Sequence, residues 1–157
     1  MRIDAYNQQK AQKPNSFWSR LLDMIAPRAC AICGKRLGIE EEMICSVCNV
    51  HLPRTDFAQE AYENEMARLF WGRIPVERCV AWMYYQAHAA SANLIYNLKY
   101  HHCPEIGIIV GKMMAQEFHQ EYFFDDIDLL IPLPLAHERE KERGYNQSMM
   151  IAQGIAD

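Results

Sequence analysis

The spacing of apolar positions along the chain predicts a succession of short helices. Apolar residues recur at intervals of three and four, which places them on one helix face. Pro27 and Gly72 would end the first two helices, and Gly107 and Gly111 would let another backbone approach the fourth closely. The segments predicted to be helical are 17–25, 61–71, 90–99, 105–120 and 148–156.

Two other stretches have the composition of β-strands. The segment "IPVERCVAWMYYQ" (74–86) is rich in Val, Trp and Tyr, which predicts a strand or a hairpin. The run "DLLIPLPL" (128–135) is short, apolar and flanked by predicted helices, which is typical of a buried parallel strand. Pro132 and Pro134 lack backbone N–H donors, so that strand would end there. The pattern therefore predicts an α/β fold.

Length and composition narrow the class of protein. The chain has 157 residues, half of them apolar, which suffices for one modest domain or a small module with part of a larger one. We expect no membrane span, because no run of about 18 apolar residues occurs. The first residues are polar and lack an apolar signal core, so we expect a cytoplasmic location. A net charge of −4 argues against a general electrostatic grip on nucleic acid.

Four cysteines form the most informative motif, "CAICGKRLGIEEEMICSVC". They are two Cys-x-x-Cys pairs, Cys30 with Cys33 and Cys45 with Cys48, a spacing typical of zinc ligands. The residues between the pairs predict a short hairpin, as in a zinc ribbon. Four sulfur ligands leave no position for a catalytic water, so we expect the zinc to be structural.

Other roles for the cysteines fit the sequence less well. A redox Cys-x-x-Cys usually stands alone at a helix start, and disulfides would need an oxidising compartment. Cys79 and Cys103 are interpreted as ordinary thiols. The tract His101 to Cys103 is a weak ligand set, because three adjacent side chains cannot easily face one ion.

A basic loop follows the predicted strand in "PLAHEREKERGYNQS". Arg139 and Arg143 are four residues apart, so one helical turn would place both on the same side. Gly144 would end that turn, and Asn146 or Ser148 could cap the next helix. A strand, a basic loop and a helix N-terminus together predict an anion site. The alternative is a solvated charge run, because glutamates occupy 138, 140 and 142.

The order of these motifs resembles that of the ComF family (competence protein F, including GntX-like proteins). The matching residues are "CAIC…CSVC" followed by "HLP", then "LIYNLKY", and then "DLLIPLPLAHEREKERGYNQS". The resemblance implies an α/β fold in which a small N-terminal zinc ribbon precedes a partial type I phosphoribosyltransferase-like domain with a Rossmann-like parallel sheet. The implied divisions are a polar tail and apolar helix, the ribbon, a linker helix and the front part of the transferase-like domain, at 1–28, 29–55, 56–75 and 76–157.

The family also implies a function in natural competence, with handling of incoming single-stranded DNA and binding of phosphoribosyl pyrophosphate (PRPP) together with Mg²⁺. Competence helicase-type proteins would be partners. The residues that would face PRPP or its pyrophosphate are Lys99, Arg139, Arg143, Gly144 and Asn146.

The chain departs from such transferases at the PRPP signature. Asp125 and Asp126 form an acidic pair, but "IDLLIP" follows them in place of a Thr- and Gly-rich loop. We therefore expect this chain to be the front part of a longer protein and inactive by itself, and the sequence does not decide whether the whole protein is an enzyme.

Two other functions also fit the sequence. A zinc ribbon without chemistry could dock on protein or nucleic acid, or the chain could belong to a nucleotide-salvage phosphoribosyltransferase. In the first case basic side chains would contact phosphates and aromatic ones would stack on bases, although core packing is the simpler role for the aromatics. The candidates are Lys35, Arg36 and Arg54, and Trp71, Trp82 and Tyr84.

Overall fold

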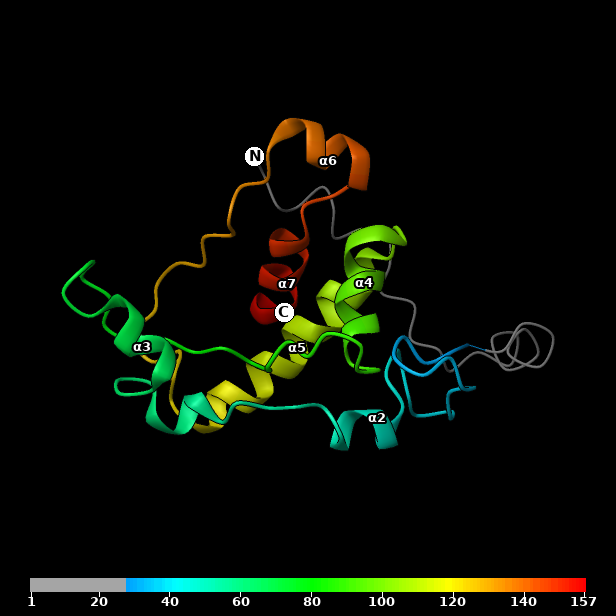
Figure 1. Cartoon of the computed structure of the whole chain (residues 1–157), viewed down its shortest axis with the longest axis horizontal. Coiled ribbons are helices and arrows are strands. Elements are labelled where there is room, and N and C mark those ends of the chain that lie inside the picture. Colours follow the sequence, from blue (N-terminus) through cyan, green and yellow to red (C-terminus); the bar gives the residue numbers. More distant parts are fainter. Residues whose placement is uncertain (1–27) are drawn as a thin grey trace.

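The computed structural model describes residues 28–157, which form a set of helices joined by long connections (Figure 1). The predicted helix at 17–25 lies outside these residues. In chain order the elements are α2 (Ser46–Val50), the 3₁₀ helix η2 (Phe57–Glu60), α3 (Glu65–Phe70), α4 (Ala92–Tyr100), α5 (Pro104–Gln120), α6 (His137–Arg143) and α7 (Gln147–Ala156).

The predicted Rossmann-like parallel sheet is wrong, because residues 28–157 contain no sheet. Their β pairing consists of two isolated antiparallel bridges, Ala29 with Arg36 and Arg54 with Met83. The apolar run 128–135 is an uncovered connection between α5 and α6, and Leu129, Ile131 and Leu133 are 71%, 80% and 76% exposed (Figure 1). A strand needs a neighbour to accept its backbone hydrogen bonds, and none of the described residues pairs with this run. In 74–86 the β pairing is limited to the Arg54–Met83 bridge, flanked by backbone hydrogen bonds from Thr55 to Trp82 and from Tyr84 to Pro53, so no extended strand forms.

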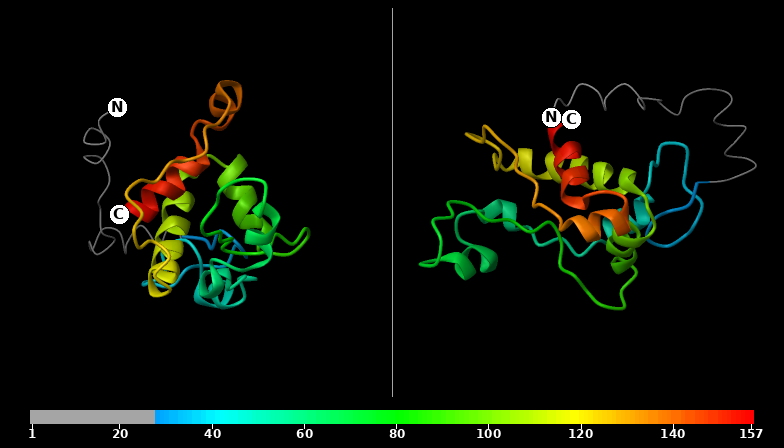
Figure 2. Two further views of the ribbon diagram at one scale, coloured as in Figure 1. Left: turned by 90° about the vertical axis from the view of Figure 1, so that its left-hand side faces the viewer. Right: turned by 90° about the horizontal axis from the view of Figure 1, so that it is seen from above.

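α5 and α7 lie side by side and their backbones touch (Figure 2). A Cβ atom added at Gly111 would lie 2.2 Å from the carbonyl oxygen of Ile151, and one added at Gly154 would lie 2.0 Å from that of Ile108. The prediction that glycines on the fourth helix admit a close backbone is thus confirmed.

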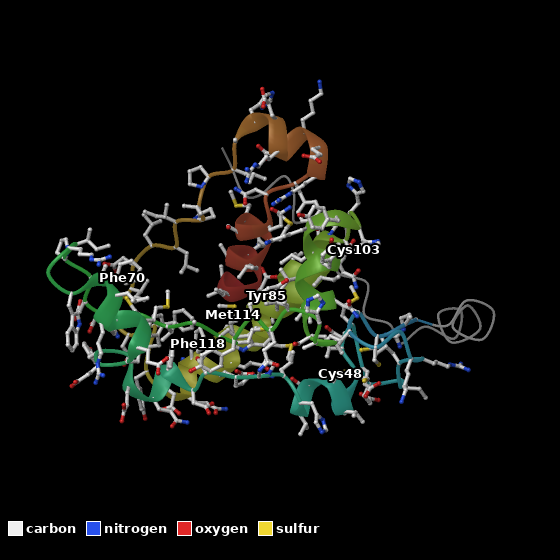
Figure 3. The ribbon with its side chains drawn as sticks, in the orientation of Figure 1. Cys48, Phe70, Tyr85, Cys103, Met114 and Phe118 are labelled. Atoms are coloured by element: carbon white, nitrogen blue, oxygen red, sulfur yellow. The ribbon has the colours of Figure 1, made fainter. Side chains whose placement is uncertain are left out.

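The apolar core joins the cysteine-rich segment to the helices. Leu94 and Leu98 of α4 and Ile106 of α5 are buried in the same cluster as Ile32 and Ile44, which lie between the cysteines. Figure 3 shows Met114 and Phe118 along α5, toward the far end from Cys48. The cysteine segment is therefore packed on α4 and α5 and is not a separate appendage.

Candidate metal centre

The four cysteines of the motif come together at one point. Their Sγ atoms all lie within 4.8 Å of one another, and the Sγ atoms of Cys33 and Cys45 are 3.8 Å apart. In a tetrahedral site with Zn–S bonds of about 2.3 Å, neighbouring sulfurs are about 3.8 Å apart. The cluster is therefore compatible with a four-sulfur site for a structural metal such as zinc.

The first cysteine pair is held by a tight turn. Gly34 donates its N–H to the carbonyl of Cys30 at 2.9 Å, and Cys30 donates its own to the carbonyl of Lys35 at 2.8 Å. Gly34 has a φ of 72°, in the left-handed region that glycine enters at little cost. This turn brings the Cys33 sulfur back toward Cys30.

The second pair lies at the start of α2, where Cys45 is the N-cap residue. Glu41 fixes this start, because its carboxylate accepts hydrogen bonds from the N–H of Gly38 at 2.7 Å and from the N–H and Oγ of Ser46 at 2.6 Å each. The Gly38 N–H, followed by the two Ser46 donors, lowers the pKa of Glu41 to about 2. Glu41 thus remains charged and holds the loop between the pairs in place.

Hydrogen bonds to sulfur prepare one thiol for ionisation. The Sγ of Cys30 accepts the N–H of Cys45 at 3.3 Å and that of Ile32 at 3.5 Å. Burial of Cys30 opposes ionisation, but the backbone N–H groups of Cys33, Cys45 and Ile32 outweigh it and lower the pKa of Cys30 to about 6. Burial, followed by hydrogen bonds to the other thiols, raises the pKa of Cys48. Because metals bind thiolates, these N–H groups favour the form of Cys30 that a metal needs.

Two asparagines of α4 hold the first pair from outside. Asn93 donates its side-chain N–H to the carbonyl of Ile32 at 2.9 Å, and Asn97 donates to the carbonyl of Ala31 at 2.7 Å. Neither residue was predicted from the sequence. Their spacing of four was the one available signal, and it equally fits two solvated side chains.

Arg54 connects the second pair to α5. Its guanidinium donates to the backbone carbonyl of Asn49 at 2.9 Å and forms an ion pair of 2.6 Å with Glu117. It also lies 4.7 Å from the centre of the Trp82 ring, and the Trp82 indole donates to Glu117 at 2.7 Å. Arg54 and Trp82, considered above as nucleic-acid contacts, are therefore engaged inside the protein, whereas Trp71 and Tyr84 are exposed.

The five residues predicted to contact PRPP are distributed over α4, α6 and the connection from α6 to α7. Lys99 is exposed on α4, and Arg139 is exposed on α6. Gly144 ends α6 with a φ of 79°. Asn146 caps α7 by accepting the N–H of Ser148 at 2.9 Å. Gly144 and Asn146 thus have structural roles.

Arg143 is the member of this set that contacts both α4 and α7. Its guanidinium lies 5.7 Å from the centre of the Tyr100 ring and donates to the side-chain oxygen of Gln147 at 2.8 Å. Its backbone carbonyl lies 2.9 Å from Nδ1 of His102. The C-terminal end of α6 therefore contacts the C-terminal end of α4, where Lys99 also lies.

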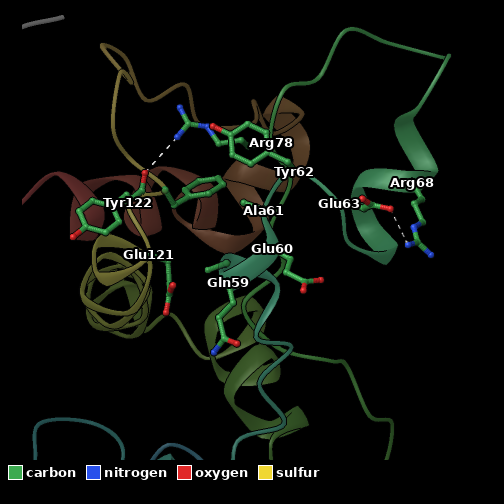
Figure 4. A pocket seen from close by; sticks show the side chains of 11 residues that line it. Gln59, Glu60, Ala61, Tyr62, Glu63, Arg68, Arg78, Glu121 and Tyr122 are labelled. Atoms are coloured by element: carbon green, nitrogen blue, oxygen red, sulfur yellow. Dashed lines mark hydrogen bonds and ion pairs between the residues drawn. The ribbon is translucent and has the colours of Figure 1, made fainter.

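A cavity of about 510 Å³ lies elsewhere, between the 58–63 segment and the turn after α5 (Figure 4). Arg78 lines it, with its guanidinium 5.8 Å from the ring centres of Tyr62 and Phe123. The same group donates to the carbonyls of Tyr122 at 3.4 Å and Asp125 at 2.6 Å. These contacts tie two distant segments together, and no cysteine lines the cavity.

Comparison with protein-family models, with curated proteins and with solved structures found no match to this chain. The four-cysteine cluster is the part of the resemblance described above that the structure reproduces. Within residues 28–157, no helix combines the length and apolar character needed to cross a membrane.

Proposed function

We propose that Cys30, Cys33, Cys45 and Cys48 hold one zinc ion whose role is structural. The observation that carries this proposal is the approach of all four Sγ atoms to within 4.8 Å of one another. Four thiolates fill a tetrahedral zinc, so the ion would shape the segment and would have no open position for a water or substrate.

Elemental analysis tests this proposal. Protein purified under reducing conditions should contain one zinc per chain, and a strong chelator should remove it with loss of ordered structure in the cysteine segment. Metal-free protein that keeps its native fold, with a spectrum unchanged by chelator, would contradict the proposal.

We further propose that this is a ComF-like protein of natural competence that binds single-stranded DNA. Support comes from an exposed aromatic pair on α4: Tyr96 and Tyr100 are 59% and 54% exposed, with ring centres 5.0 Å apart. Arg143 lies over Tyr100, and Lys99 is exposed on the same helix. Aromatic faces beside basic groups are the elements with which proteins bind single strands. We define the α4 platform as these four residues.

Fluorescence anisotropy with a labelled oligonucleotide tests the α4 platform. Because a stacked base contributes about 1–3 kcal/mol, Tyr100→Ala should weaken binding about 10-fold, and Lys99→Ala should reduce its salt dependence. Tyr85→Ala is the matched control, since Tyr85 is also exposed but lies outside the platform. Equal losses in Tyr85→Ala and Tyr100→Ala would refute the proposal.

PRPP with Mg²⁺ is the alternative ligand of the neighbouring loop. Calorimetry with PRPP distinguishes this ligand from single-stranded DNA. Binding of a phosphoribosyl ligand should depend on Arg139 and should not depend on Tyr96. PRPP binding lost in Arg139→Ala, without measurable affinity for DNA, would replace the DNA proposal with this one.

A further inference from the structure

The two asparagines of α4 act on peptide units that face the cysteine cluster. Asn97 donates to the carbonyl oxygen of Ala31 at 2.7 Å, and the N–H of the same peptide unit, that of Ile32, donates to the Cys30 sulfur at 3.5 Å. In a trans peptide the C=O and N–H point in opposite directions. A hydrogen bond that fixes the oxygen from outside therefore aims the N–H inward at the sulfur.

The next peptide unit repeats this arrangement. Asn93 donates to the carbonyl oxygen of Ile32 at 2.9 Å, and the N–H of that unit belongs to Cys33, one of the backbone groups that lower the pKa of Cys30. Hydrogen bonds in a chain polarise one another, so each amide would strengthen the N–H···S bond on the other side of its peptide unit. One helix thus acts twice on one sulfur.

α4 is suited to this role because the face next to the two asparagines is fixed. Leu94 and Leu98 are buried in the core, and the hydroxyl of Tyr145 donates to the backbone carbonyl of Leu98 at 2.5 Å. Asn93 and Asn97 are one turn apart, the same step that separates the two leucines. The amide groups are therefore presented by a helix that cannot easily rotate.

We propose that Asn93 and Asn97 are positioning residues of the metal centre, which orient the 31–32 and 32–33 peptide units so that their N–H groups stabilise the Cys30 thiolate as a metal ligand. The inference rests on the proposed zinc site. It adds that the affinity of this site depends on a helix about 60 residues away in sequence, with separations of 61 and 66 for the two bonds.

Zinc affinity of the full chain, measured by competition with a chromophoric chelator, tests the inference. Outer-sphere partners of metal ligands typically contribute 10- to 100-fold to affinity. We expect Asn97→Ala and Asn93→Ala each to weaken zinc binding about 10-fold. In the Co²⁺-substituted protein, both variants should shift the thiolate-to-metal absorption band, which a general loss of stability would not do.

Asn64→Ala is the matched control. The Asn64 amide also holds a backbone carbonyl, that of Cys79 at 2.7 Å, and its side chain caps α3, so its loss destabilises the fold outside the four-cysteine cluster. We expect Asn64→Ala to lower the unfolding midpoint while leaving zinc affinity and the Co²⁺ spectrum unchanged.

The outcomes separate the inference from the zinc proposal. If the wild-type chain binds no zinc, the proposed function fails. If the wild type binds zinc and both asparagine variants stay within twofold of it, the positioning inference alone is refuted. An equal loss of zinc affinity in Asn64→Ala and Asn97→Ala would also overturn the positioning inference. If Asn97→Ala fails to fold, Asn93→Ala provides the same test, because Asn93 is exposed.

Discussion

Replacing Cys45 with serine is expected to remove zinc from the protein and to unfold the 30–48 segment. Serine does not supply a thiolate, so the site would keep three sulfurs and would lose one of the four metal–thiolate bonds behind a binding free energy of about 10–16 kcal/mol. The apolar side chains buried in this segment are few, chiefly Ile32, Leu37 and Ile44, and cannot hold it together without the metal. The zinc content should fall from one per chain to less than about one tenth.

Elemental analysis and amide hydrogen exchange measure these two effects. Cys103→Ser is the matched control, because the Cys103 thiol lies outside the cluster and donates to the carbonyl of His101 at 3.2 Å. This control should keep its zinc and the protection of residues 30–48. Full zinc content in Cys45→Ser would show that the four sulfurs do not act as a set.

Gly154→Ala is expected to lower the free energy of unfolding by about 3 kcal/mol, the upper part of the range for overpacked sites. The added methyl group would lie 2.0 Å from the carbonyl oxygen of Ile108. That atom belongs to the backbone of α5, so the two helices would have to separate. At an exposed position within a helix, replacing glycine with alanine raises the free energy of unfolding by about 0.5–1 kcal/mol. A decrease at Gly154 would therefore show that the close contact exists.

Urea unfolding, followed by circular dichroism, measures this change. Gly111→Ala tests the same crossing from the other helix, because its methyl group would lie 2.2 Å from the carbonyl oxygen of Ile151. Gly38→Ala is the control, since its nearest neighbour is the flexible Glu41 side chain at 3.4 Å. Equal stabilities of Gly154→Ala and Gly38→Ala would contradict the described packing of α5 on α7.

The helices could be predicted where local signals suffice. The helix predicted at 105–120 is α5, which spans Pro104–Gln120, and the helix predicted at 90–99 is α4, which spans Ala92–Tyr100. In both, apolar spacing indicates the helix, and Pro104 marks the start of the second one. The 61–71 prediction was longer than α3, because Asn64 caps the helix from within that range.

A sheet was predicted wrongly because a strand depends on residues far away in sequence. The composition of 128–135 fits a buried strand, yet burial and pairing require neighbours that a local pattern does not specify. Leu129 and Ile131 are therefore exposed where the pattern placed them in a core.

The cysteine ligands could be predicted from the sequence, whereas the residues that hold them in place could not. Cys-x-x-Cys spacing is a local signal, and the structure brings the four sulfurs together. Glu41, Asn93 and Asn97 are ordinary polar residues in the sequence, and their contacts depend on how the segments meet in space. Sequence reasoning therefore found the candidate ligands and missed what holds them.

The contacts of Glu117 restrict how related sequences can diverge at this position. The Glu117 carboxylate accepts from both Arg54 and the Trp82 indole. Glutamine could still accept the indole proton but would leave the arginine charge unbalanced, and aspartate is one methylene shorter. Evolutionary drift at 117 would thus require compensating changes at 54 and 82, so we expect these three positions to covary among homologues, linking α5 to the segment that follows the second cysteine pair.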